Sequence, residues 1–110
     1  MERRLGLRGR TDFRVELHNG FLATAVRGVE LSGSGIVLDR GPGRGRRDEP
    51  LLVRLTLHLP ERVRPIVAVA RPVWGFGQQQ AYRFVTVDDV DRLSLAEHLD
   101  LVARAGTALH

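Results

Sequence analysis

The chain of 110 residues has the length of one domain and carries 17 basic and 13 acidic residues, a formal net charge of +4. It contains no cysteine, which excludes disulfides, thiolate metal sites and iron–sulfur clusters, and no lysine, which excludes a Walker A loop and Schiff-base chemistry. Apolar runs fall short of the roughly 20 residues of a membrane span, and the N-terminus lacks an apolar signal core. We therefore expect a cytoplasmic protein that does not insert into a membrane.

The positive charge lies in the first half of the chain. Residues 1–47 carry ten arginines against five acids, whereas residues 88–110 carry two arginines against five acids. One cluster comprises Arg3, Arg4, Arg8, Arg10 and Arg14, and a second comprises Arg40, Arg44, Arg46 and Arg47. Such clusters indicate either an anionic partner or a solvated basic surface.

The first half of the chain predicts an extended lead-in followed by three strands. Residues 1–12 lack periodicity and are interpreted as a flexible basic lead-in. Residues 13–17 alternate between apolar and polar, as in a half-buried strand, and Asn19-Gly20 predicts a hairpin leading to a strand over 21–31. Gly28 indicates a bulge in that strand. A glycine-rich turn over 32–35 then precedes a short strand over 36–38.

The second half predicts three more strands and a helix. A loop over 41–50 leads to strands over 51–59, 66–74 and 81–87, and Pro72 favours an edge position or a bulge. Ser94 and Glu97 fit a capping box, and Gly106 fits the position just past a helix end. The expected fold is mainly β: one domain over 13–110, a small six-stranded antiparallel β-barrel with one C-terminal α-helix.

No arrangement of residues predicts catalysis or a metal centre. The four histidines fall in unrelated elements without metal-ligand spacing: His18, His58, His98 and His110. Ser32 and Ser34 lack the surroundings of a nucleophile elbow, and the acidic run at Asp88, Asp89 and Asp91 is typical of a helix start. We expect a binding protein without enzymatic activity, metal or cofactor.

Two motifs occur in a set order. The first is Arg4-Leu5-Gly6-Leu7-Arg8, an Arg-x-x-x-Arg, and the second is Glu30-Leu31-Ser32-Gly33-Ser34-Gly35, an acid-x-Ser-x-x-Gly. Downstream, VARPVWGFGQQQAYRF is typical of a strand, a turn and a returning strand. In this combination the chain resembles the PilZ domain, a family of bacterial receptors for cyclic di-GMP, from about Arg3 to the C-terminal helix.

The resemblance implies a ligand and the residues that hold it. Cyclic di-GMP would be bound by Arg4, Arg8, Glu30, Ser32 and Gly35, with Arg3, Arg10, Gly33 and Ser34 as additional contacts. Guanidinium groups suit this ligand because they grip phosphates or guanine edges bidentately and stack on purines. Glu30 departs from the family pattern, which has a shorter acid or amide there, so its carboxylate reaches about one bond length further.

A second Arg-x-x-x-Arg is formed by Arg10 and Arg14, and it is an alternative to Arg4 and Arg8. Arg4 and Arg8 are preferred, because Arg14 fits an outward position in an alternating strand and the gap from Arg8 to Glu30 leaves room for the lead-in and both strands.

The resemblance implies a stand-alone receptor, monomer or dimer, that signals to an unidentified effector protein in the control of motility or biofilm formation. Its lead-in would order over the ligand. One alternative is a PilZ-like adaptor that does not bind the nucleotide, which the unusual Glu30 favours. The other is a nucleic-acid-binding barrel, favoured by the basic loop over 40–47. A nucleic-acid-binding barrel is not expected, because most of the six aromatic residues fit core positions rather than base-stacking platforms.

Overall fold

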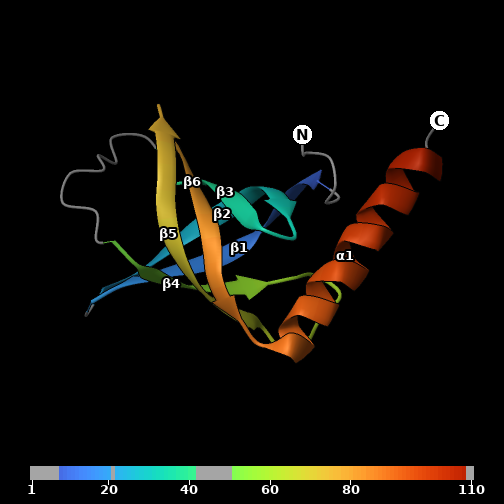
Figure 1. Ribbon diagram of the computed structural model, residues 1–110. Coiled ribbons are helices and arrows are strands. Elements are labelled where there is room, and N and C mark those ends of the chain that lie inside the picture. The colour runs from blue at the N-terminus through green and yellow to red at the C-terminus, as the bar shows by residue number, and fades with distance from the viewer. Residues whose placement is uncertain (1–7, 21, 42–50, 109–110) are drawn as a thin grey trace.

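The computed structural model describes residues 8–20, 22–41 and 51–108. The six strands are β1 (Arg8–Asn19), β2 (Leu22–Ser32), β3 (Gly35–Asp39), β4 (Val53–His58), β5 (Ile66–Phe76) and β6 (Gln79–Val87), and the helix is α1 (Asp89–Ala108). All neighbouring strands are antiparallel, and they close into a barrel in the order β1-β2-β3-β6-β5-β4 (Figure 1). The predicted six-stranded barrel with a C-terminal helix is confirmed.

The barrel core follows from the alternation of apolar residues along the strands. Val15 and Leu17 on β1 face Leu55 and Leu57 on β4, and all four side chains are at most 2% exposed. Alternate residues of a strand point to opposite faces, so the residues between them face solvent. Each fully buried aliphatic side chain contributes about 1.5–3 kcal/mol relative to an exposed one, which makes this interior the main source of stability.

Strand boundaries differ from the sequence expectation at β1. The strand begins at Arg8 rather than Phe13, and residues 8–10 pair with β2 instead of preceding the barrel. At the other end Asn19 pairs with Leu22, and Gly20, with φ of 66°, occupies the turn in the left-handed region that favours glycine. The predicted hairpin is therefore confirmed, displaced by one residue.

Two predicted irregularities are also confirmed. The β2–β3 register shifts between Gly28 and Glu30, and the β5–β6 register shifts between Pro72 and Trp74. Because the barrel is closed, Pro72 occupies a bulge rather than an edge strand. Of the predicted loop over 41–50, residues 42–50 lie outside the described part of the chain.

Helix α1 begins earlier in the chain than the capping-box pattern predicts, so that prediction is wrong. Helix α1 starts at Asp89, and the Arg92 N–H donates to the Asp88 carbonyl at 2.8 Å, so Ser94 lies inside the helix rather than at its N-cap. Acidic residues in the first turn, Asp89 and Asp91, are favoured by the positive end of the helix dipole. The helix also continues through Gly106 to Ala108 instead of ending before the glycine.

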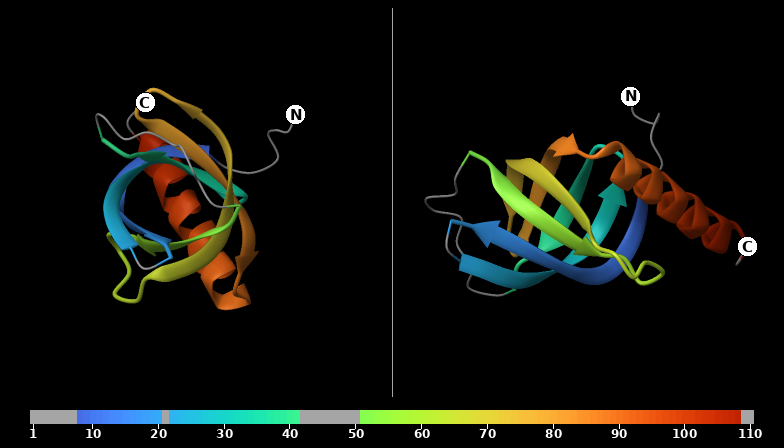
Figure 2. Two further views of the ribbon diagram at one scale, coloured as in Figure 1. Left: turned by 90° about the vertical axis from the view of Figure 1, so that its left-hand side faces the viewer. Right: turned by 90° about the horizontal axis from the view of Figure 1, so that it is seen from below.

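The N-terminal part of α1 covers one end of the barrel, and the rest projects beyond it (Figure 2). Leu95 and Leu99 join the barrel core. One hydrogen bond and two ion pairs tie the helix to the β4–β5 connection: Glu61 with His98 at 2.7 Å, Arg64 with Asp91 at 3.6 Å, and Arg62 with Glu97. In the described part of the chain, no helix combines the length and apolarity needed to cross a bilayer.

Replacing Leu95 by Ala should lower the free energy of unfolding by roughly 2–5 kcal/mol, because Leu95 is 2% exposed and its removal leaves a cavity between helix and barrel. Leu93→Ala is the matched control on the same helix, since Leu93 is 64% exposed and surface changes stay within about 0.5 kcal/mol. Urea unfolding of the three proteins measures the difference. Equal losses in both variants would contradict the assignment of Leu95 to the helix–barrel contact.

Candidate ligand-binding site

The second motif forms the turn between β2 and β3. Leu31 is buried in the core, so Glu30 and Ser32 lie on the outer face of the barrel. The Ser32 Oγ accepts hydrogen bonds from the N–H groups of Ser34 and Gly35, both at 3.2 Å. This hydroxyl therefore shapes the turn and presents the exposed backbone of Gly33 and Ser34 to solvent.

Gly35 is required by a close approach between strands. A Cβ atom added to Gly35 would lie 2.4 Å from the Tyr82 carbonyl oxygen on β6. The same contact region includes a hydrogen bond from the Phe84 N–H to the Ser34 carbonyl at 2.8 Å. The motif glycine thus permits β6 to pack against the turn, in addition to any approach by a ligand. By contrast, a Cβ at Gly33 would meet nothing within 4 Å.

The register of β1 against β2 brings the two sequence motifs together. Arg8 lies directly opposite Ser32, and Arg10 lies directly opposite Glu30. Arg3 and Arg4 lie outside the described residues. The structure therefore places the second arginine of the first motif beside the serine of the second motif, 24 positions later in the sequence (32 − 8 = 24).

The alternative arginine, Arg14, lies elsewhere on the barrel. It follows a register shift between Arg10 and Phe13, and it is paired with Arg27 rather than with the turn. Its guanidinium is 64% exposed and lies 3.2 Å from the Glu16 carboxylate. The register thus associates Arg8 and Arg10, and not Arg14, with the candidate site.

The pairing of β3, β6 and β5 extends the site into two parallel rows of cross-strand neighbours, whose members on β2, β3, β6 and β5 lie on the outer face. The turn row comprises Arg8, Ser32, Gly35, Arg83 and Arg71. The floor row comprises Arg10, Glu30, Val37, Ala81 and Trp74. Residues that are adjacent within a row lie on neighbouring strands, about 4.8 Å apart.

The floor row contains an apolar patch outside the barrel core. Val37 and Ala81 alternate with core residues and so face outward, yet they are only 9% and 6% exposed. Trp74, which the sequence suggested for the core or the barrel rim, lies at the end of this row and is 47% exposed. The bulge after Pro72 shifts the alternation of β5, and this turns the indole outward.

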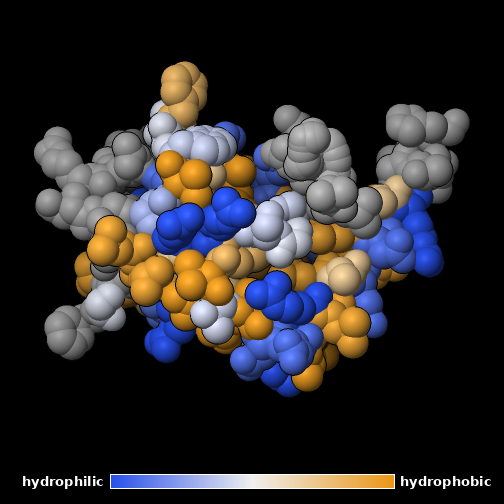
Figure 3. Space-filling model, in the orientation of Figure 1, coloured by the Kyte–Doolittle hydropathy of each residue, from blue (hydrophilic) through white to orange (hydrophobic). Residues whose placement is uncertain are grey.

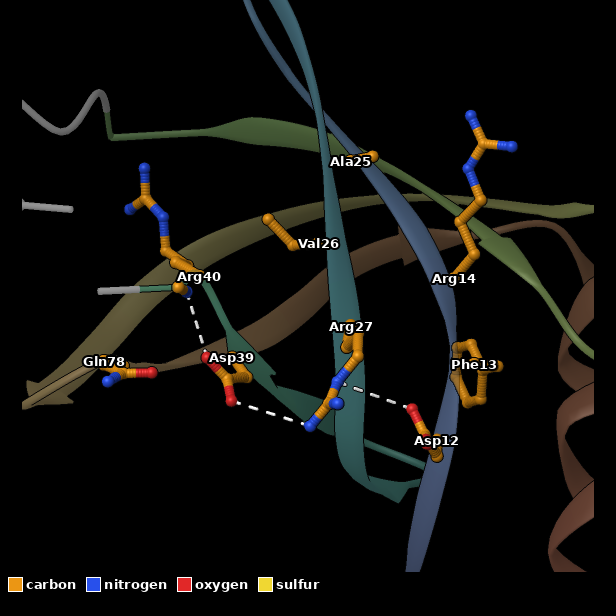
Figure 4. A pocket seen from close by; sticks show the side chains of 10 residues that line it. Asp12, Phe13, Arg14, Ala25, Val26, Arg27, Asp39, Arg40 and Gln78 are labelled. Carbon is orange, nitrogen blue, oxygen red and sulfur yellow. Dashed lines mark hydrogen bonds and ion pairs between the residues drawn. The ribbon is translucent and has the colours of Figure 1, made fainter. Parts of the chain in front are cut away.

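A separate groove of about 590 Å³ lies next to the rows, at the outer side of β1, β2 and β3 (Figure 4). The guanidinium of Arg27 lies in it between Asp12 at 3.5 Å and Asp39 at 3.6 Å. Because two carboxylates already neutralise this arginine, the groove offers less unbalanced positive charge than the turn row.

The fold is a small closed β-barrel that carries one C-terminal helix. A solved structure of the Bacillus subtilis inhibitor of motility (MotI/DgrA) matches 90% of this chain with a TM-score of 0.77 at 18% identity, and the chain spans 50% of that protein. A PilZ domain of CeSA from a cellulose-synthesizing bacterium matches 90% of this chain and is covered over 97% of its own length, with a TM-score of 0.63 at 16% identity.

A third solved structure, an uncharacterized protein from Legionella, matches 91% of this chain and is covered over 97% of its length, with a TM-score of 0.60 at 13% identity. No protein-family model and no curated protein matches the chain. At these identities the similarity concerns the fold, and the chain is a PilZ-like domain.

Gly35→Ala should lower the free energy of unfolding by roughly 1–3 kcal/mol, because the added methyl group collides with the Tyr82 carbonyl and forces β3 away from β6. Gly33→Ala should change stability far less, because its Cβ enters open space at ordinary φ. Chemical denaturation of both variants measures the difference. A Gly35→Ala protein as stable as Gly33→Ala would contradict the close approach of the two strands.

Proposed function

We propose that this domain binds cyclic di-GMP on the outer face formed by the turn and floor rows, and passes the signal to a separate effector protein. The observation that carries the proposal is the β1–β2 register, which pairs Arg8 with Ser32 and Arg10 with Glu30. Residues of two motifs that lie far apart in sequence thereby meet at one turn. The PilZ-like fold supports the same ligand class.

The chemistry of each residue suits a cyclic dinucleotide. Arg4 and Arg8 would bind a phosphate or the O6/N7 edge of guanine, with Arg3 and Arg10 adding positive charge nearby. The Glu30 carboxylate would accept hydrogen bonds from the N1–H and N2–H groups of guanine. The exposed turn at Gly33 and Ser34, shaped by Ser32, would contact the ligand through its backbone.

The floor row offers a surface for a purine. Val37 and Ala81 form a small apolar floor, and the Trp74 indole lies at one end of the row, three strand spacings from Glu30. Because Val37 and Ala81 are already almost buried, a base placed on this row would bury mainly the exposed part of the Trp74 indole. Base–aromatic stacking contributes about 1–3 kcal/mol, so Trp74 would add affinity without depending on hydrogen-bond geometry.

The place of Arg4 in the sequence suggests how ligand binding would be signalled to an effector protein. This residue precedes β1, so a ligand held by both Arg4 and the turn would fasten the segment before β1 onto the barrel. Ordering a segment on binding creates a new surface, a common device in signalling proteins. An effector protein that recognises this surface would respond only to the bound form. The likeness to an inhibitor of motility makes motility control a candidate process.

Isothermal titration with cyclic di-GMP should show micromolar or tighter binding by the wild-type protein and a loss of at least roughly a hundredfold in Arg4→Ala/Arg8→Ala, because charged hydrogen bonds each contribute about 1.5–3 kcal/mol. The fluorescence of Trp74, the only tryptophan of the chain, should change on binding and offers a second readout. Binding should also weaken with added salt, as phosphate contacts do.

Arg14→Ala is the control for this titration, because Arg14 lies away from the turn and should leave affinity nearly unchanged. If Arg14→Ala, and not Arg4→Ala/Arg8→Ala, abolished binding, the site would belong to the second arginine pair. If the wild-type protein gave neither heat nor a thermal shift at high ligand concentration, the receptor function would be wrong and an adaptor that binds only proteins would replace it.

Glu30→Ala should weaken cyclic di-GMP binding roughly tenfold or more, because it removes the acceptor for the guanine N–H groups. Glu30→Asp keeps the charge and shortens the side chain to the length typical of the family, so its affinity should equal or exceed that of the wild type. Calorimetry of the two variants under one set of conditions compares them. Unchanged affinity in Glu30→Ala would show that Glu30 makes no contact with the ligand.

A further inference from the structure

Two arginines at the end of the turn row lie directly opposite each other. Arg71 on β5 pairs with Arg83 on β6, and Arg83 in turn pairs with Gly35, the last residue of the motif turn. Both are exposed, and their neighbours Ala70 and Tyr82 are buried, so both side chains lie on the outer face. Apolar and charged groups alternate on the face that β5 and β6 present (Figure 3).

Among the residues that the structure describes, this pair has no acidic partner, unlike several other arginines. Like charges directly opposite on antiparallel strands destabilise a sheet. Arg27, Arg62, Arg64 and Arg104 each form an ion pair with an acidic side chain. No ion pair joins Arg71 or Arg83 to another residue that the structure describes. The repulsion between them therefore has no internal compensation within the described chain.

The backbone around Arg71 is also irregular. Register shifts occur on both sides of it, between Val69 and Ala70 and between Pro72 and Trp74. Bulges change the direction in which side chains leave a strand and are frequent next to binding sites. Here the two bulges isolate a short stretch of regular pairing, and the Arg71–Arg83 pair lies within it.

We propose that Arg71 and Arg83 form an anion subsite for a phosphodiester of the bound dinucleotide, an inference that rests on the function proposed above. The two phosphates of a cyclic dinucleotide lie on opposite sides of its ring. A ligand centred on the turn, with one phosphate toward Arg8, directs the other toward β6. Arg83 lies two strand spacings from Ser32 by way of Gly35, roughly 10 Å, within reach of an extended arginine side chain.

An anion between two guanidinium groups would remove their repulsion. Each guanidinium can donate two parallel hydrogen bonds to a phosphate, and two of them convert an unfavourable cross-strand pair into a favourable bridge. The subsite would also favour ligands with two phosphates over those with one. A mononucleotide with a single phosphate that contacts Arg8 would leave the second subsite empty.

The test compares Arg71→Gln/Arg83→Gln with a control of equal charge, Arg54→Gln/Arg92→Gln. Arg54 and Arg92 are exposed, lie off both rows on β4 and α1, and form no ion pair with a described residue. Titration with cyclic di-GMP at two salt concentrations should show affinity reduced at least roughly tenfold in the first variant and nearly unchanged in the control. The slope of the logarithm of the affinity against the logarithm of the salt concentration should also become shallower by about one or more.

A thermal melt of the free proteins separates binding from folding. Because the first variant relieves a like-charge pair, its midpoint should equal or exceed that of the wild type. If Arg71→Gln/Arg83→Gln bound cyclic di-GMP as tightly as the wild type, or if the control variant lost as much affinity, the subsite would be wrong and the receptor function would stand. Absence of binding by the wild-type protein would overturn the proposed function and the subsite with it.

Discussion

The antiparallel register of β1 against β2 is the constraint on which the candidate site depends. A slip of one residue would transfer every side chain of β1 to the opposite face of the sheet. The register is held by the buried alternation of Phe13, Val15 and Leu17 and by the glycine turn that follows Asn19. With this part of the strand fixed, the register shift between Arg10 and Phe13 then sets Arg8 opposite Ser32.

The outer face of the barrel is shaped by departures from regular pairing. The bulge after Gly28 in β2 places Glu30 beside Val37, and the bulge after Pro72 in β5 places Trp74 beside Ala81. Without these irregularities the outward rows would combine different residues. The close contact of Gly35 with Tyr82 then holds β3 and β6 together under the turn. The candidate site on this closed barrel thus depends on local irregularities that the core tolerates.

The fold could be predicted because alternation in residues 13–17 and 51–59 reports burial directly. The start of β1 could not be predicted, because residues 8–12 carry no apolar alternation and the strand is extended to Arg8 by the pairing of residues 8–10 with β2. The predicted start of the helix was wrong for a related reason. The capping-box pattern at Ser94 fits local rules, but the first turn of α1 is held by contacts with a distant segment, because the Asp91 carboxylate meets Arg64 and the Val67 N–H. Local sequence does not contain such tertiary contacts.

The candidate site was predictable only in part, because some of its residues are placed by local sequence and others by tertiary contacts. The turn at Ser32 to Gly35 is local, and the sequence located it. The contribution of Trp74 and of the Arg71–Arg83 pair depends on which residues of β5 and β6 lie level with that turn. Two bulges in β5 shift its register against β6 and so change which residues pair beside the turn. A pattern of alternation read through Pro72 therefore places the indole on the wrong face.

The distribution of charge across the barrel separates structural from functional arginines. At the helix end, Arg62 and Arg64 meet Glu97 and Asp91, so these guanidinium groups hold α1 to the β4–β5 connection. Along the turn row, Arg71 and Arg83 oppose each other instead. Neutralised pairs stabilise the free domain, whereas uncompensated positive groups cost stability until an anion arrives. The net charge of +4 therefore says less about ligand binding than the place where, among the described residues, two arginines oppose each other.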